Sequence, residues 1–188
     1  LPGTPAIVVG SNGHIAWAFT NSEGDWVDVV VVETDPDDKD SYKTPDGPRK
    51  FEHVQETIKV KDAAEETPDI PSTIWGPAID HHPQAPPHAI PRVAPAPAGV
   101  NMGLMRLESA DNLDDALRLA NLSGSPAQNF VVADDQGRIA WTILGRIPKR
   151  VGFDGRLPTS WADGTRRWDG YLTPEEYPRI VNPEAGRI

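Results

Sequence analysis

Residues 8–17 read VVGSNGHIAW, and residues 131–141 read VVADDQGRIAW. In each stretch, β-branched and aromatic residues flank a polar turn that contains glycine, and the second turn is one residue longer. Apolar residues on both sides of such a turn are a strong signal for a β-hairpin. The sequence therefore predicts two similar hairpins, with the hypothesis that they lie in facing sheets.

Further elements are predicted outward from these hairpins. Residues 26–32 contain four consecutive valines, which are typical of a strand buried on both faces. Residues 51–61 alternate apolar and polar, which predicts a strand with one face in water. Residues 34–50 and 62–73 are interpreted as polar loops, and the tail after residue 152 as irregular structure. A helix is predicted from the apolar stripe Leu113, Ala116, Leu117 and Ala120, with Ser109 or Asp111 as its cap and Gly124 as its end.

The composition indicates a β-rich globular body with many turns. The chain has 188 residues, with 20 Pro and 16 Gly, and we expect residues 1–188 to form a single domain. Residues 77–98 are proline-rich and are interpreted as a long ordered connection, although a linker between domains is an alternative. Cysteine is absent, which excludes disulfides, zinc–thiolate sites and a cysteine nucleophile.

The net charge argues against two classes of partner. The formal net charge is −10, and no basic stripe offsets it, so nucleic acid is not expected to bind. No apolar run is long enough to cross a bilayer, so a membrane partner is not expected either. The chain opens on a turn without Met or a targeting pattern, and it stops abruptly. We therefore expect an internal stretch of a longer polypeptide.

Common catalytic and metal-binding motifs are missing. No nucleophile elbow, phosphate-binding loop or zinc-protease signature occurs. His81, His82 and His88 cluster on the proline-rich stretch without spacing that would aim them at a metal, so an exposed loop is the preferred interpretation. The acidic run at residues 35–40 lacks the glycine and terminal glutamate of a calcium loop and is interpreted as a solvated turn.

Three segments resemble the penicillin acylase family, in the same order as in that family. They are residues 2–33, which contain the first hairpin and SEGDWVDVVVVE, residues 129–150, NFVVADDQGRIAWTILGRIPKR, and residues 156–188, RLPTSWADGTRRWDGYLTPEEYPRIVNPEAGRI. The resemblance implies an α+β fold, namely part of an αββα sandwich of antiparallel sheets. It also implies that the chain is an internal fragment of a larger acylase β subunit.

The resemblance implies chemistry as well. Members of this family are N-terminal-nucleophile hydrolases, in which the free α-amine of a Ser acts as base for the hydroxyl of that Ser. That Ser is absent from this sequence, and neither Ser11 nor Ser22 is a substitute, so the fragment alone is expected to be inactive. The parent protein is expected to hydrolyse linear amides of penicillin or related N-acyl compounds. The alternatives are an N-acyl-homoserine lactone acylase and a non-catalytic β-rich binding module.

Four residues match functional positions of the family. Asn21 matches a residue whose backbone N–H donates to the oxyanion, and Asn129 matches an asparagine whose side-chain amide donates to it. Arg150 matches an arginine of the polar network around the active site. Leu104 falls in a region that lines the acyl pocket of relatives, with ordinary core packing as the alternative. For Asn21 and Asn129 the alternative is a purely structural role at a turn or a strand end. For Arg150 the alternative is an ordinary exposed arginine at the surface.

The remaining expectations also come from the resemblance. No cofactor is required, but some members bind a structural calcium ion at a run matched by Asp25, Val27 and Asp28. The expected partners are a small-molecule N-acyl substrate and the remainder of the precursor, which supplies an α subunit and the missing β-subunit strands. A periplasmic or secreted location and a role in the antibiotic response are expected. Exposed sheet edges also predict self-association of the fragment.

Overall fold

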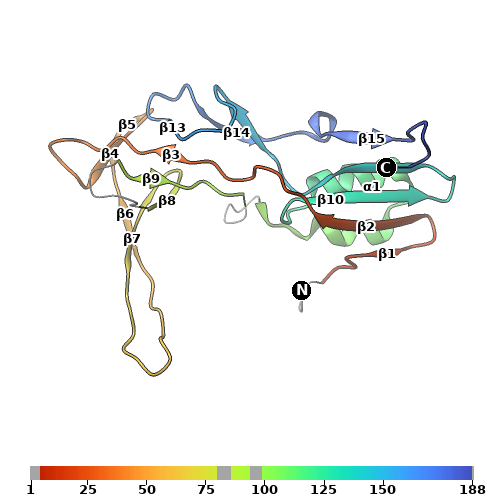
Figure 1. Cartoon of the computed structure of the whole chain (residues 1–188), viewed down its shortest axis with the longest axis horizontal. Helices are drawn as coiled ribbons and strands as arrows, with labels where there is room; N and C mark the ends of the chain where they lie inside the picture. Colours follow the sequence, from red (N-terminus) through yellow and green to blue (C-terminus); the bar gives the residue numbers. More distant parts are fainter. Residues whose placement is uncertain (1–4, 80–85, 94–98, 188) are drawn as a thin grey trace. The chain divides into compact units, whose positions relative to one another are not determined.

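The computed structural model describes residues 5–79, 86–93 and 99–187 (Figure 1). The chain folds into two compact units. The first takes residues 1–26, 93–149 and 170–188, and the second takes residues 27–92 and 150–169. Each unit has its own core, and the expectation of a single domain stays a prediction. Across the described residues, no helix has both the length and the apolar character that a membrane span needs.

The first unit contains a five-stranded sheet in the order β1-β2-β10-β11-β15, in which neighbouring strands are antiparallel. Its strands are β1 (Gly10–Ser11), β2 (Ile15–Asn21), β10 (Gln128–Asp134), β11 (Ile139–Leu144) and β15 (Arg179–Val181). Side chains alternate between the two faces, as the pleat of a strand requires. Phe130 and Val132 are buried, whereas Val131 between them is exposed. The α+β class with antiparallel sheets is therefore confirmed.

Both predicted hairpins form, but their predicted placement in facing sheets is wrong. β1 pairs with β2, β10 pairs with β11, and β2 also pairs with β10, so one sheet contains all four strands. Each turn is fixed by a side-chain oxygen that accepts two backbone N–H groups. Asn12 accepts from His14 and Ile15, while Asp134 accepts from residues 136 and 138. The two similar turns therefore belong to a single sheet, because β2, which follows the first turn, pairs directly with β10, which precedes the second turn.

Helix α1 (Leu113–Leu122) covers one face of this sheet (Figure 1). The predicted stripe is correct, because all four of its apolar residues are buried in the core with Phe130. The predicted cap is wrong: Asn112 is the N-cap, and its side chain accepts the backbone N–H of Asp115 at 2.9 Å. At the other end, Asn121 donates to the Thr142 hydroxyl at 3.1 Å and to the Ile143 carbonyl at 2.9 Å. These two bonds tie the buried end of the helix to β11.

A 3-10 helix, η2 (Met102–Ser109), precedes α1 and was not predicted. Its Asn101 cap accepts the N–H of Gly103 at 2.8 Å and donates to the Leu122 carbonyl at 3.0 Å. Leu107 is buried, and Leu104 packs against the same core as α1. The segment therefore packs against the same core as α1.

The second unit contains a six-stranded sheet in the order β13-β3-β9-β8-β7-β6. Its strands are β3 (Val30–Val31), β6 (Glu52–Gln55), β7 (Asp69–Thr73), β8 (Gly76–Ile79), β9 (His88–Ala89) and β13 (Thr159–Ser160). β13 is parallel to β3, and the other pairs are antiparallel. The predicted valine strand lies between β13 and β9 in this sheet and is much shorter than residues 26–32. The prediction that both of its faces are buried is wrong, because Val31 is only half-buried. Val30 and Val32 are fully buried, whereas Val27 is exposed.

Three further sequence interpretations in this unit are wrong. Residues 34–50 were expected to be a loop, yet they contain the strands β4 (Ser41–Thr44) and β5 (Gly47–Lys50), which pair with each other. Residues 51–61 were expected to be a strand with one buried face, yet β6 ends at Gln55 and all four of its residues are exposed. Residues 62–73 were expected to be a loop, yet β7 begins at Asp69 and pairs with β6. Strands β6 and β7 form an arm that extends from the sheet (Figure 1). Backbone pairing rather than burial defines them, so hydrophobic periodicity could not locate their ends.

The remaining elements are short. They are the strand pair β4 (Ser41–Thr44) and β5 (Gly47–Lys50), the pair β12 (Pro148–Val151) and β14 (Arg167–Tyr171), and the 3-10 turn η3 (Pro174–Glu176). The tail after residue 152 is therefore more regular than expected, since it contributes strands to three sheets. Of the proline-rich residues 77–98, the described part contains β9 and the end of β8, and residues 80–85 and 94–98 lie outside the described residues.

Candidate functional site

The two residues expected to donate to an oxyanion lie side by side in the first unit. β2 and β10 run antiparallel, with Asn129 opposite Thr20 and Gln128 opposite Asn21. The Asn129 side-chain Nδ2 donates to the backbone carbonyl of Asn21 at 2.9 Å. The two residues are 108 positions apart in the chain, so only the pairing of these strands brings them together.

A third residue contacts the same amide. The indole Nε1 of Trp141, on β11, donates to Asn129 Oδ1 at 3.2 Å. Asn129 is half-buried at the end of its strand, so its amide is held in place and remains accessible. Fixed neutral N–H groups of this kind can stabilise a negative oxygen that develops during acyl transfer. Sequence reasoning did not identify Trp141, because its distance from Asn129 depends on the hairpin register.

Arg150 lies in the second unit and forms an ion pair with Asp28. Arg150 Nε is 2.9 Å from Asp28 Oδ2 and 3.2 Å from Oδ1. The Asp28 side chain is 1% exposed, and Trp168 Nε1 also donates to its Oδ2, at 2.6 Å. A buried carboxylate needs such partners, because burial of an unpaired charge is strongly unfavourable. The structure thus gives Arg150 a definite partner, and it adds Trp168, which the sequence did not indicate.

The run Asp25, Val27 and Asp28 supplies hard oxygen donors of the type that calcium prefers. Both carboxylate oxygens of Asp28 already accept hydrogen bonds from Arg150 or Trp168. Within the described residues, no group of three or more His, Asp or Glu side chains is arranged to hold a metal ion. These residues alone therefore do not form a calcium shell, and any further ligands would have to come from outside them.

The other residues considered from the sequence have structural surroundings. Leu104 is partly buried and packs against the core of the first unit. Ser11 donates to the Ile15 carbonyl at 2.8 Å within the first hairpin turn. Of the three histidines on the proline-rich stretch, His88 lies in β9, and His81 and His82 lie outside the described residues. A substrate-lining role for Leu104 stays a prediction.

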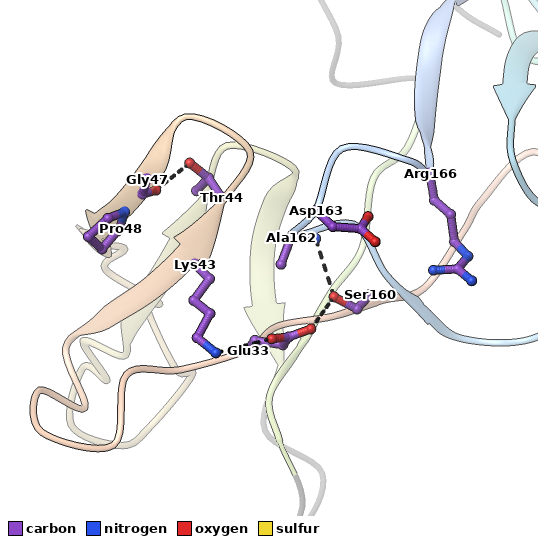
Figure 2. A pocket seen from close by; sticks show the side chains of 9 residues that line it. All are labelled: Glu33, Lys43, Thr44, Gly47, Pro48, Ser160, Ala162, Asp163 and Arg166. Atoms are coloured by element: carbon purple, nitrogen blue, oxygen red, sulfur yellow. Dashed lines mark hydrogen bonds and ion pairs between the residues drawn. The ribbon is translucent and has the colours of Figure 1, made fainter.

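An open pocket of ≈ 440 Å³ lies in the second unit (Figure 2). Its lining residues are Glu33, Lys43, Thr44, Gly47, Pro48, Ser160, Ala162, Asp163 and Arg166. Glu33 accepts from the Ser160 hydroxyl at 2.7 Å, and Lys43 Nζ lies 3.5 Å from the same carboxylate. Ser160 in turn accepts the Ala162 N–H at 3.2 Å. None of the residues expected from the sequence to form the site lines this pocket.

A second polar cluster, also missed from the sequence, centres on His53 of β6. Its Nε2 is 2.9 Å from Asp40 Oδ1, and its Nδ1 is 2.6 Å from Asp69 Oδ2. The hydrogen bond to Asp40, which is the larger cause, and the hydrogen bond to Asp69 raise the pKa of His53 above its usual range. The cluster links the acidic loop at residues 35–40, which contains no fully buried residue, to the β6–β7 arm.

Comparison with known proteins gives a consistent picture. The family model described as Penicillin amidase matches residues 1–188. The chain is 28% identical over 207 residues to an acyl-homoserine lactone acylase from Pseudomonas fluorescens, covering 100% of the chain and 24% of that protein. It is 30% identical to a penicillin G acylase from Escherichia coli, covering 98% of the chain and 22% of that protein.

A solved structure is also similar. The chain superimposes on a thermostable penicillin G acylase from Alcaligenes faecalis with a TM-score of 0.81 and 25% identity, over 97% of this chain and 33% of that one. The chain therefore spans about a quarter of the length of these curated relatives, in line with the expectation that it is part of a larger protein.

Proposed function

Because the chain belongs to the penicillin amidase family, we propose that the longer protein is an acylase that hydrolyses a linear amide bond and releases an acyl group from an amine. The nucleophile in this proposal is an N-terminal Ser supplied by the rest of the protein. Asn21 and Asn129 serve as oxyanion donors, the first through its backbone N–H and the second through its side-chain amide.

One observation carries this assignment. The Asn129 amide donates to the Asn21 carbonyl at 2.9 Å, so the two residues proposed as donors are neighbours at the end of paired strands. When the Ser hydroxyl attacks the substrate, the carbonyl oxygen becomes negative. Donors that are already in place stabilise that charge without reorganisation.

Arg150 does not act directly in this proposal. Its guanidinium is paired with Asp28, so we assign it to the polar network that supports the site. Leu104 is proposed to contribute to the acyl pocket through its partly buried side chain.

The test is hydrolysis by the full-length protein of a chromogenic phenylacetyl anilide, beside its Asn129→Ala variant. We expect the parent to cleave the anilide and the variant to lose about two to three orders of magnitude in kcat. A parent that cleaves equally well without the Asn129 amide contradicts the oxyanion assignment. A parent that cleaves no member of a wide acyl panel favours the binding-module alternative.

The names of the relatives suggest two substrate classes for this protein. Some relatives are named acyl-homoserine lactone acylases and others penicillin acylases. Comparison of kcat/KM for N-acyl-homoserine lactones with that for phenylacetyl amides and penicillin G would separate a quorum-quenching role from an antibiotic-related one. A preference above about tenfold, or about 1.4 kcal/mol, for one class would assign the protein to it.

A structural calcium ion remains a separate proposal, independent of the chemistry. Asp25 is the residue to test, because a substitution of Asp28 would also break its hydrogen bonds with Arg150 and Trp168. Calorimetric titration of the full-length protein with Ca²⁺ should give a binding heat that Asp25→Asn reduces. A titration without heat in the wild-type protein contradicts calcium binding.

The partner and location expectations also belong to this proposal. Val131 and Ile180 are exposed apolar residues in register with Trp141 on the face of the sheet opposite α1. Such a face favours contact with the remainder of the protein, or self-association when the 188-residue chain is alone. Light scattering across a dilution series checks the second case, and a monodisperse monomer contradicts it. Secretion or periplasmic export is checked by fractionation of cells that express the full-length protein.

A further inference from the structure

The two ends of the Asn129 amide have chemically different partners. Trp141 Nε1 donates to Oδ1, and Nδ2 donates to the Asn21 carbonyl. An indole N–H can only donate, and a backbone carbonyl can only accept. Each partner therefore tolerates only one of the two orientations of the amide. A flipped amide would place NH₂ against the indole N–H and oxygen against the Asn21 carbonyl.

The strand register explains how Trp141 reaches this position. In the β10–β11 ladder, Asn129 is opposite Ile143 and Val131 is opposite Trp141. Trp141 is thus the diagonal neighbour of Asn129 on the same face, a separation that an aromatic side chain can span. Both side chains are half-buried and lie on the face opposite the one that packs Phe130 against α1.

We infer that Trp141 is a positioning residue that holds the Asn129 amide with its NH₂ directed toward Asn21. One NH₂ hydrogen then bonds to the Asn21 carbonyl, and the other is available for the oxygen of a reacting acyl group. The catalytic consequence rests on the proposed function, whereas the fixed orientation of the amide does not. Preorganisation of this kind is what makes an oxyanion donor effective.

The test compares Trp141→Phe with a matched control, Trp17→Phe, in the full-length protein. Phe keeps an aromatic ring and removes the N–H. Trp17 ends the same Ile-Ala-Trp motif in the first hairpin, but its indole donates to the Ile7 carbonyl at 3.2 Å and its ring is buried in the core with α1. For Trp141→Phe we expect kcat to fall about tenfold with KM within about twofold, because an interaction made in the transition state is weakened. Trp17→Phe should lower the melting temperature and leave kcat within about twofold.

A double variant separates positioning from general packing. If Trp141 acts through Asn129, then Trp141→Phe combined with Asn129→Ala should be no slower than Asn129→Ala alone. Effects that multiply would overturn the inference. So would a Trp141→Phe enzyme with wild-type kcat when Asn129→Ala is slow, and that result would leave the proposed function standing.

A readout that needs no activity completes the test. Selective ¹⁵N labelling of asparagine side chains gives an NH₂ signal for Asn129, identified by its loss in Asn129→Ala. In Trp141→Phe we expect this signal to shift and its hydrogens to exchange at least about tenfold faster, since one anchoring bond is gone. An unchanged signal would overturn the inference. If the full-length protein cleaves no amide, the proposed function fails and this signal alone decides the role of Trp141.

Discussion

Arg150 and Asp28 form a buried ion pair across 122 positions of sequence, with Nε within 2.9 Å of Oδ2 and 3.2 Å of Oδ1. The carboxylate is almost fully buried, and it also accepts a hydrogen bond from the Trp168 indole. The residue expected to belong to an active-site network therefore also neutralises a charge inside the second unit. A substitution of Arg150 should therefore lower the free energy of unfolding, because it removes a partner of the buried Asp28 carboxylate.

Arg150→Met is predicted to destabilise the second unit strongly. The substitution keeps a long apolar side chain but leaves Asp28 with the Trp168 indole as its remaining donor. Loss of one partner from a buried pair costs about 3–5 kcal/mol, which should appear as a lower melting temperature in calorimetry. Arg156→Met is the control: Arg156 lies 3.6 Å from Asp154 but is 85% exposed, so its loss should cost less than about 1 kcal/mol. Equal effects of the two variants would contradict the buried-pair assignment.

Phe130→Ala is predicted to destabilise the first unit. Phe130 is fully buried and lies between Phe19 and Thr142 in the centre of the sheet. Removal of a buried aromatic ring costs about 3–5 kcal/mol, because it loses contacts and leaves a cavity. The adjacent Val131 is 39% exposed on the other face, so Val131→Ala should cost under about 1 kcal/mol. Urea unfolding followed by fluorescence measures the stability of both variants. Similar midpoints would contradict the assignment of Phe130 to the buried face of the sheet and of Val131 to the exposed face.

The sequence predicted best what depends on neighbouring residues. Both hairpins were predicted because their turns and flanking β-formers lie within about a dozen residues. The apolar stripe of α1 was predicted for the same reason. The pairing of β2 with β10 was not, because no local pattern encodes it, and the hairpins were therefore assigned to the wrong sheets.

The candidate site was accessible from the sequence only through resemblance. Asn21 and Asn129 were matched to family positions, and the structure then placed them in contact. Trp141 and Trp168 had no such match, and a donor bond from an indole to a distant side chain has no sequence signal. The β6–β7 arm was misjudged for another reason: β6 is exposed and no residue of β7 is fully buried, so the hydrophobic pattern that marks a buried strand face is absent.

Asn112→Ala should destabilise α1 by about 1 kcal/mol, the usual cost of losing an N-cap. The sequence offered Ser109 and Asp111 as caps, but the cap must directly precede the first helical residue, Leu113. Asn112 occupies that position and accepts the Asp115 N–H at 2.9 Å. Asp111→Ala is the control and should change the melting temperature little. A larger effect from Asp111→Ala than from Asn112→Ala would contradict this cap.

The His53 cluster predicts a pH-dependent contribution to stability. Hydrogen bonds to Asp40 and Asp69 raise the His53 pKa in the folded protein, so folding favours the protonated imidazole. The contribution should therefore be fully present below the unfolded pKa of about 6.5, and it should be lost as pH rises through the higher folded pKa. Lys50, 3.8 Å from Asp40, keeps its charge over this range and does not change the sign.

The measurement is the melting temperature of the wild-type protein and of His53→Gln at about pH 5.5 and about pH 9. Gln can still hydrogen-bond but cannot carry a charge. We expect the melting temperature of the wild type to exceed that of the variant by more at the lower pH, because the imidazole is protonated there. Asp69→Asn should reduce this difference, since one of the two carboxylates that favour the imidazolium is gone. A difference that is constant with pH, or that grows toward pH 9, would mean that the charge on His53 does not stabilise the contact between the acidic loop and the β6–β7 arm.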